Sequence, residues 1–199
     1  MDINDIKLVN SLWGKVYPYL SAHIMESYRR DSGEVLELGP FSGGISLELT
    51  RLYPELNITI ADESPGVVEY LEEEVSATEL SEGIMVEKTD LNCLAFDDSE
   101  FDLIIFRGAF FFLNAKENLL REIFRVLKDG GMAFVGGGYG REAPREIIDE
   151  IADESRDLNE RLGRRRVSIE ELEELMKKSG LADNCKIESE GGLWLIIRK

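Results

Sequence analysis

Short apolar runs alternate with amphipathic stretches along the middle of the chain. Five runs, rich in β-branched and aromatic residues and bounded by turn residues, have the pattern of buried strands. They are residues 34–38, 57–62, 84–90, 101–106 and 131–137. Between them, apolar residues recur at helical spacing, most clearly in the stretch KENLLREIFRVLKDGG. Alternating strands and helices predict a doubly wound α/β fold whose parallel sheet is covered on both faces.

The two ends of the chain depart from this alternation. Residues 5–30 predict one or two helices, interrupted near Pro18, which we expect to cover the top of the sheet. Near the other end, Ser168 followed three residues later by Glu171 predicts a helix that begins with a capping box. Residues 185–199 contain two strand-like runs joined by a glycine-containing turn, which predicts an antiparallel hairpin.

Composition narrows the class of partner. The chain has 199 residues, enough for one well-buried core, and its 40 acidic against 23 basic side chains give a net charge of −17. Such a charge repels a polyanion, so we expect no nucleic-acid partner. No apolar stretch is long enough to span a membrane, and the amino terminus lacks the pattern of a signal peptide, which favours a cytoplasmic protein. Cys93 and Cys185 have no metal-like spacing, so we expect reduced thiols and no metal site.

The strongest chemical signal is the segment ELGPFSGG, residues 37–44, between the first predicted strand and the first helix. Glycines here let the backbone approach a ligand, and the following helix offers free N–H groups to a carboxylate or phosphate. A dinucleotide-binding fingerprint would need a glycine where Phe41 stands. The loop therefore argues against a pyrophosphate ligand.

Three carboxylates close three successive predicted strands. Glu37 closes the first strand, where a cationic amine is its natural partner. Asp62 closes the second, where a carboxylate can accept both hydroxyl groups of a ribose. Asp90 closes the third, where it is expected to meet an adenine amino group. A ligand with an amine, a ribose and an adenine but no phosphate is S-adenosylmethionine, which we expect as the cofactor.

Four segments of residues 34–140 carry a family resemblance. They are VLELGPFSGGISLEL, ITIADESPGVVEYL, KTDLNCLAFDDSEFDLIIFRGAFFFL and EIFRVLKDGGMAFVGGGYG. In order and spacing these segments resemble the successive motifs of class I S-adenosylmethionine-dependent methyltransferases, including archaeal members. The resemblance implies a seven-stranded, mostly parallel Rossmann-like sheet with an antiparallel last strand. It also implies a single methyltransferase domain over residues 1–199, with 1–30 as a helical cover and 34–140 as the cofactor-binding core.

The resemblance assigns roles to individual residues. It implies Glu37, Gly39 and Gly43 around the methionine portion of the cofactor, Asp62 and Glu63 beside the ribose, Asp90 and Leu91 around the adenine, and Arg107 on the loop after the fourth strand. Many family members carry glycine where Phe41 stands, so the loop is expected to be bulkier in this chain.

The expected activity is transfer of a methyl group to an acceptor by in-line displacement, which requires alignment more than a dedicated base. A small-molecule acceptor is favoured over a protein. The candidates for a catalytic group are His23, the only histidine, Tyr139, in a glycine-rich run after the fifth strand, and Arg107. Phe110 to Phe112 follow the fourth strand, where family substrates sit, although core packing is expected for at least two of them.

Several alternatives stay open on the sequence alone. Because fold does not certify chemistry, the chain also fits a non-catalytic cofactor-binding or protein-interaction module. A nucleotide-dependent oxidoreductase is a third possibility. This chain lacks the glycine spacing that such an enzyme needs, and that function would not explain the final hairpin. The oligomeric state is open, with a homodimer the commonest case for such proteins. Residues 164–166, the one basic cluster, are expected to pair with the Glu-rich helices around them, with recognition of an anionic substrate as the alternative.

Overall fold

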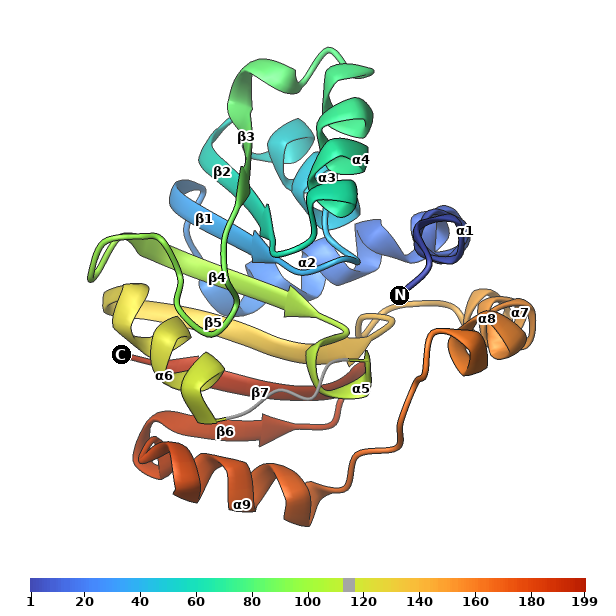
Figure 1. The fold of residues 1–199 in the computed structure, drawn as a ribbon. Coiled ribbons are helices and arrows are strands. Elements are labelled where there is room, and N and C mark those ends of the chain that lie inside the picture. Colours follow the sequence, from blue (N-terminus) through green and yellow to red (C-terminus); the bar gives the residue numbers. More distant parts are fainter. Residues whose placement is uncertain (113–116) are drawn as a thin grey trace.

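The computed structural model describes residues 1–112 and 117–199 (Figure 1). Within these residues one seven-stranded sheet has the order β3-β2-β1-β4-β5-β7-β6. The strands are β1 (Ser32–Leu38), β2 (Glu55–Asp62), β3 (Ile84–Lys88), β4 (Phe101–Arg107), β5 (Leu127–Gly138), β6 (Cys185–Glu188) and β7 (Gly192–Arg198). The first five are parallel, and β7 is antiparallel to both β5 and β6. The doubly wound sheet with an antiparallel carboxyl-terminal hairpin is therefore confirmed.

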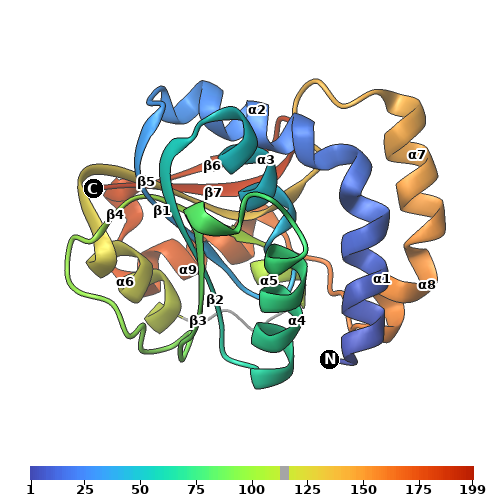
Figure 2. The same cartoon turned by 90° about the horizontal axis from the view of Figure 1, so that it is seen from above.

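Helices cover both faces of the sheet (Figures 1 and 2). Their bounds are α1 (Ile3–Trp13), α2 (Tyr17–Tyr28), α3 (Gly44–Leu52), α4 (Pro65–Ser76), α5 (Ala109–Phe112), α6 (Glu117–Val126), α7 (Arg145–Glu154), α8 (Arg156–Arg161) and α9 (Ile169–Ser179). Buried side chains of α2, α3 and α4 form one core cluster with Val35, and those of α6 and α9 form another with Leu36. Successive residues of one strand thus enter opposite clusters, which explains why the strands are apolar at nearly every position.

Three boundaries differ from the sequence prediction. The expected helix over residues 116–131 ends at Val126, because Leu127 pairs with Phe101 and already belongs to β5. The strand expected to reach Asp90 ends at Lys88, the last residue of β3 in register with β2. At the amino terminus, the interruption lies at residues 14–16, and Pro18 stands in the first turn of α2, where a missing N–H costs no helical hydrogen bond. The capping box of Ser168 and Glu171 at the start of α9 is confirmed.

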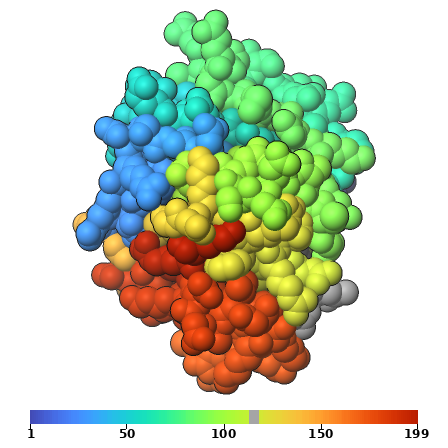
Figure 3. All heavy atoms as spheres, turned by 90° about the vertical axis from the view of Figure 1, so that its left-hand side faces the viewer, coloured from blue at the N-terminus to red at the C-terminus, as the bar shows by residue number. Residues whose placement is uncertain are grey.

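The carboxyl ends of the parallel strands point toward α1, α5, α7 and α8 (Figures 1 and 2). Strand order reverses between β1, which also pairs with β2, and β4, which also pairs with β5. Ligands of such sheets bind at this switch point, outside the carboxyl ends of the strands. At the opposite end Lys199 exchanges backbone hydrogen bonds with Gly130 and Gly131. Figure 3 shows the molecule from this side, with the carboxyl-terminal part of the chain in red and orange. No helix in the described part of the chain is both long and apolar enough to cross a membrane.

Candidate active site

Glu37, near the carboxyl end of β1, organises the loop that follows. Its side chain is fully buried, and Oε2 accepts hydrogen bonds from the backbone N–H groups of Gly43 and Ser46, both at 3.0 Å, and from Oγ of Ser46 at 2.5 Å. Burial raises the pKa of Glu37 above its usual value, and the hydrogen bonds oppose that rise. Oε1 is buried and has no hydrogen-bond partner among the described residues. Glu37 therefore fixes the start of α3 and keeps one acceptor for a ligand donor.

Gly39 is required by its backbone conformation and by its neighbours. Its φ of 94° lies in the region that favours glycine, and a Cβ added there would lie 2.5 Å from the ring of Phe106. The backbone N–H of Gly39 donates to the carbonyl oxygen of Ala61 at 2.9 Å, which holds the loop against β2. Gly43, with a φ of 101°, caps the amino terminus of α3. The loop thus lies close to the strand ends, as the sequence predicted.

The ring of Phe41 fills the space between the loops after β1 and β4. Its centroid lies 4.6 Å from that of Phe112, and a Cβ on Gly108 would approach the Phe41 ring to 2.6 Å. The bulk of Phe41 is accommodated because position 108 has no side chain. The Phe41 ring is therefore buried between the loop after β1 and the segment that follows β4.

Asp62, the last residue of β2, is a nearly buried carboxylate with a single strong donor. The backbone N–H of Ser64 donates to Oδ1 at 2.8 Å, and burial raises the pKa of Asp62 to about 6. Glu63, which follows it, is exposed. A carboxylate with one donor retains acceptor capacity for further hydroxyl groups.

Asp90 and Leu91 lie beyond the end of β3. Asp90 is exposed, and its Oδ1 accepts a hydrogen bond from the backbone N–H of Asn92 at 2.8 Å, which is a local turn interaction. Leu91 is buried in the cluster that contains α6. The structure thus places Asp90 in a turn rather than in the strand.

Arg107, predicted on the loop after the fourth strand, is instead the last residue of β4 and joins three segments. It is buried, and its guanidinium donates to the carbonyl oxygen of Phe41 from Nε at 3.1 Å and from Nη2 at 2.6 Å. Nη2 also lies 2.9 Å from Oδ1 of Asn10 and 3.0 Å from the hydroxyl oxygen of Tyr17. Every one of these acceptors is neutral, and Arg107 makes no ion pair with a carboxylate of the described residues. The amino-terminal helices are thereby tied to the glycine loop and β4.

Comparison with known proteins shows what this chain is similar to. Residues 35–131 match the model of a methyltransferase domain. A ubiquinone/menaquinone biosynthesis C-methyltransferase of Desulfotalea psychrophila is 31% identical over 100 residues, which are 50% of this chain and 39% of that protein. A malonyl-[acyl-carrier protein] O-methyltransferase of Bacillus cereus is 26% identical over 164 residues, which are 78% of this chain and 58% of that protein. This chain thus spans less than two thirds of either relative.

A solved structure from Methanococcus maripaludis, assigned to the S-adenosyl-L-methionine-dependent methyltransferases, has the same fold. Its TM-score is 0.84 at 24% identity, and the match covers 100% of this chain and 93% of that one. Residues 35–131 thus form a methyltransferase domain, and the chain has the fold of the S-adenosylmethionine-dependent methyltransferases. The expected family resemblance, including that to archaeal members, is confirmed.

In this chain the amino-terminal helices lie over the glycine loop. The ring of Tyr17 occupies the position that a Cβ on Gly44 would need, at 2.0 Å. Trp13 stacks on Tyr139 with ring centroids 4.9 Å apart and planes 8° apart, which joins the end of α1 to the loop after β5. The sequence did not predict the contacts of Asn10 and Ser46. Asn10 is a polar residue on an otherwise apolar helix face, and Ser46 is a serine in the first turn of α3, and these features are the signals that could have identified them.

A cavity of about 240 Å³ lies beside Arg107. Its aromatic lining residues are Trp13, Phe111, Phe112 and Tyr139, and its charged lining residues are Arg107 and Arg164. Phe110 instead lies in the core, and the expectation of core packing also holds for Phe112 through its contact with Phe41. The segment after the fourth strand thus both packs and lines a pocket.

His23 occupies a different environment. Its side chain is only 1% exposed, Nε2 lies 3.0 Å from Oε1 of Glu188, and the ring packs edge-on against Phe134 and Trp194. Arg141 pairs with the same carboxylate. His23 therefore lies in the core between α2 and the strands β5 and β7, a location that does not favour the role of a catalytic base.

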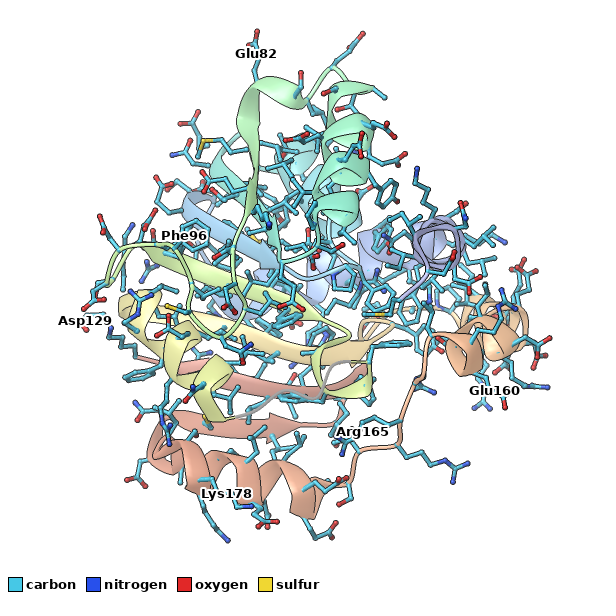
Figure 4. The ribbon with its side chains drawn as sticks, in the orientation of Figure 1. Glu82, Phe96, Asp129, Glu160, Arg165 and Lys178 are labelled. Carbon is cyan, nitrogen blue, oxygen red and sulfur yellow. The ribbon has the colours of Figure 1, made fainter. Side chains whose placement is uncertain are left out.

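The arginines of the basic cluster after α8 have different partners. Arg165, which lies on the segment that joins α8 to α9 (Figure 4), pairs with Glu171 as the sequence suggested. The Arg164 guanidinium instead lies over the ring of Phe111, 5.4 Å from its centroid, at the cavity. Only one member of the cluster is thus placed to meet a ligand in this cavity.

Proposed function

We propose that this chain is an active methyltransferase that uses S-adenosylmethionine and acts on a small molecule. Its chief support is the placement of Glu37, the glycine loop and Asp62 around the switch point of the sheet. Oε1 of Glu37 is buried without a described partner, and Asp62 is a nearly buried carboxylate with spare acceptor capacity. Both features fit a ligand that brings its own donors.

In this proposal each residue keeps the role that the family resemblance implies. Glu37, Gly39 and Gly43 hold the methionine portion, Asp62 and Glu63 hold the ribose, and Asp90 and Leu91 flank the adenine. Arg107 acts on the acceptor side, because it lines the cavity there while its Nε and Nη2 bind the loop and the helical cover. When bound, the cofactor supplies a methyl group on a sulfonium, which the acceptor's lone pair takes in line while the carbon–sulfur bonding pair passes to sulfur.

The chain's own residues align the acceptor and exclude water. The stacked Trp13 and Tyr139 close one side of the acceptor cavity. Tyr139 has a pKa raised by burial, so its hydroxyl is protonated at neutral pH and can donate but not remove a proton. With His23 enclosed in the core, we infer that the acceptor enters already carrying a nucleophilic lone pair.

The class of partner that we propose follows from the net charge of the chain and the size of the cavity. A net charge of −17 disfavours nucleic acid, and a cavity of about 240 Å³ suits a small acceptor better than a folded protein. We place the chain in the cytoplasm as a single domain over residues 1–199, with residues 1–30 covering the core.

The test is cofactor binding and turnover in matched variants. Asp62→Ala should weaken S-adenosylmethionine binding by roughly 1 to 3 kcal/mol, because ribose hydroxyls lose a charged acceptor. Asp129→Ala, an exposed position at the far end of the sheet (Figure 4), should leave binding unchanged. Release of S-adenosylhomocysteine in the presence of a mixed panel of thiols, amines, hydroxyl compounds and carboxylates would support an enzyme. Tight cofactor binding without release from any acceptor would favour the non-catalytic module.

A further inference from the structure

The cavity beside Arg107 has the opposite charge to the rest of the chain. Its lining residues include two arginines and no aspartate or glutamate, in a protein with a net charge of −17. Because the surrounding surface is acidic, a cation-lined recess concentrates the local positive potential at one place. A ligand carrying negative charge is favoured there over a neutral or cationic one.

Arg107 supplies a buried charge at the inner end of the cavity. It is 4% exposed, and its hydrogen-bond acceptors are the neutral oxygens of Phe41, Asn10 and Tyr17. A buried guanidinium is normally paired with an anion, because removing it from water is costly without one. The described residues provide no carboxylate at ion-pair distance, although Glu37 influences it from farther away. The ring centroids of Trp13, Tyr17 and Phe41 lie 4.9, 5.3 and 5.5 Å from Cζ of Arg107, and these rings stabilise its charge. An anionic ligand would add the partner of full opposite charge that these rings do not provide.

Arg164 supplies a second charge from a different element. Its guanidinium lies over the face of Phe111, and its backbone N–H donates to the carbonyl oxygen of Asn159 at 2.8 Å. The next N–H, that of Arg165, donates to the carbonyl oxygen of Phe111 at 2.7 Å. These bonds hold the segment after α8 against the loop after β4. In the described part of the chain Arg164 has no acidic partner, whereas Arg165 has Glu171.

The remaining walls are flat. The Trp13 ring stacks on that of Tyr139 and its centroid also lies 4.9 Å from Cζ of Arg107, and Phe111 and Phe112 contribute further aromatic surface. Gly137 and Gly138 also line the cavity, and their lack of side chains lets the Phe111 ring and the backbone of Gly191 pack close to them. Nε1 of Trp13 is buried without an acceptor among the described residues, so it offers one more N–H donor. Flat walls with N–H donors match a planar ligand with oxygen acceptors.

We propose that this cavity is the acceptor site and takes a small planar carboxylate, held by Arg164 and Arg107 against the aromatic walls. The assignment of the cavity as an acceptor site rests on the proposed function. The preference for a carboxylate rests on the residues that line the cavity. A cavity of about 150 Å³ accommodates benzene, so about 240 Å³ has room for a fused or substituted aromatic ring. The carboxylate is either the anchor or the nucleophile, and the lone pair needed for methyl transfer is present on its oxygen without a base.

The experiment is a calorimetric titration of the full chain with 2-naphthoate, its neutral isostere 2-naphthamide and the cation 2-naphthylmethylamine. We expect 2-naphthoate to bind at least about tenfold more tightly than the other two, since charge-assisted hydrogen bonds exceed neutral ones. Arg164→Ala should lower the affinity for 2-naphthoate about tenfold and leave that for 2-naphthamide nearly unchanged. Arg166→Ala removes the same charge two residues away, outside the cavity lining, and should change neither.

Two results would overturn the inference. One is equal affinity for the acid and the amide, which would mean that the cavity does not select charge. The other is an equal loss in Arg164→Ala and Arg166→Ala, which would assign the effect to general attraction by the basic cluster. S-adenosylmethionine binding, measured on the same samples, separates this outcome from the proposed function. Failure to bind the cofactor defeats the proposed function, whereas failure to prefer 2-naphthoate defeats only the assignment of the acceptor.

Discussion

The hydroxyl group of Tyr17 accepts a hydrogen bond from Nη2 of Arg107 over 3.0 Å, although 90 residues separate them in the sequence. The same hydroxyl donates to the carbonyl oxygen of Asn10 at 3.2 Å, and burial raises the pKa of Tyr17 to about 12. One phenol thus connects the end of α1, the start of α2 and the carboxyl end of β4. The position of the helical cover depends on this connection.

Tyr17→Phe should therefore loosen the cover. The variant keeps the ring over Gly44 but removes the hydrogen bonds of the hydroxyl group with Asn10 and Arg107, and we expect a loss of about 1 to 2 kcal/mol in the free energy of unfolding. Hydrogen exchange should rise in residues 3–28 more than in the sheet. Tyr19→Phe is the matched control, because no hydrogen bond of its hydroxyl is seen among the described residues. Equal exchange in both variants would contradict the role given to Tyr17.

Gly44→Ala tests the close approach of the cover to the loop. The new Cβ would lie 2.0 Å from the ring of Tyr17, so the ring or the helix must move, and we expect destabilisation above about 1 kcal/mol. Gly14→Ala adds the same methyl group where nothing lies within 4 Å and should be neutral or slightly stabilising. Urea denaturation of the two variants gives the comparison. A stable Gly44→Ala protein would show that Tyr17 does not pack there in solution.

Ser46→Ala tests how Glu37 is held. The change removes the 2.5 Å hydrogen bond to Oε2 and should raise the pKa of Glu37 further, with a loss of about 1 to 2 kcal/mol at pH 8. Because the folded-state pKa of Glu37 is already raised, the carboxyl is protonated more readily as the pH falls. The loss should then be smaller at acid pH.

Ser42→Ala is the internal control for this series. Ser42 is a buried serine in the same loop, but its Oγ has no partner in the described residues. Its replacement should be neutral or stabilising at every pH. Equal unfolding free energies for the two serine variants would contradict the role of Ser46 in holding Glu37.

The pKa of about 6 at Asp62 predicts a pH dependence of cofactor binding. Ribose hydroxyls bind the ionised carboxylate best, so the affinity for S-adenosylmethionine should fall as the pH drops through 6, by up to about tenfold per pH unit. The stability of the free protein should change with pH in the opposite direction. Because the folded-state pKa is raised, the stability linked to Asp62 is fully present below pH 3.8 and is lost as the pH rises through 6.

Asp62→Asn should abolish both dependences. Calorimetry at pH 5 and pH 7.5 measures the first, and denaturation of the free protein at the same two values measures the second. An unchanged affinity profile in the variant would mean that another group controls binding.

The sequence predicted the sheet well because strand and helix periods differ strongly in this chain. Residues such as Val35 and Leu36 enter opposite core clusters, so each strand is a continuous apolar run that is easy to recognise. The ends of helices and strands were harder to predict where pairing between strands determines them. Leu127 continues a helical pattern, but its partner Phe101 lies in another strand, and local sequence carries no record of that pairing.

The candidate site was predictable in its acids and glycines and not in its long-range contacts. Glu37 and Asp62 follow from their places at strand ends, whereas the raised pKa of each depends on burial by distant segments. Arg107 was assigned to the loop after β4, but its bonds to Asn10 and Tyr17 depend on how α1 and α2 dock. The split between Arg164 and Arg165 likewise requires the position of Phe111.

The most direct test of the central claim is a parallel calorimetric titration of the wild-type chain with S-adenosylmethionine, S-adenosylhomocysteine and NAD. The loop after β1 has Phe41 where a pyrophosphate-binding loop needs glycine, and Asp62 stands ready for ribose hydroxyls. We predict binding of the first two ligands and none of NAD. Binding of NAD, or of none of the three, would contradict the assignment of this site to S-adenosylmethionine.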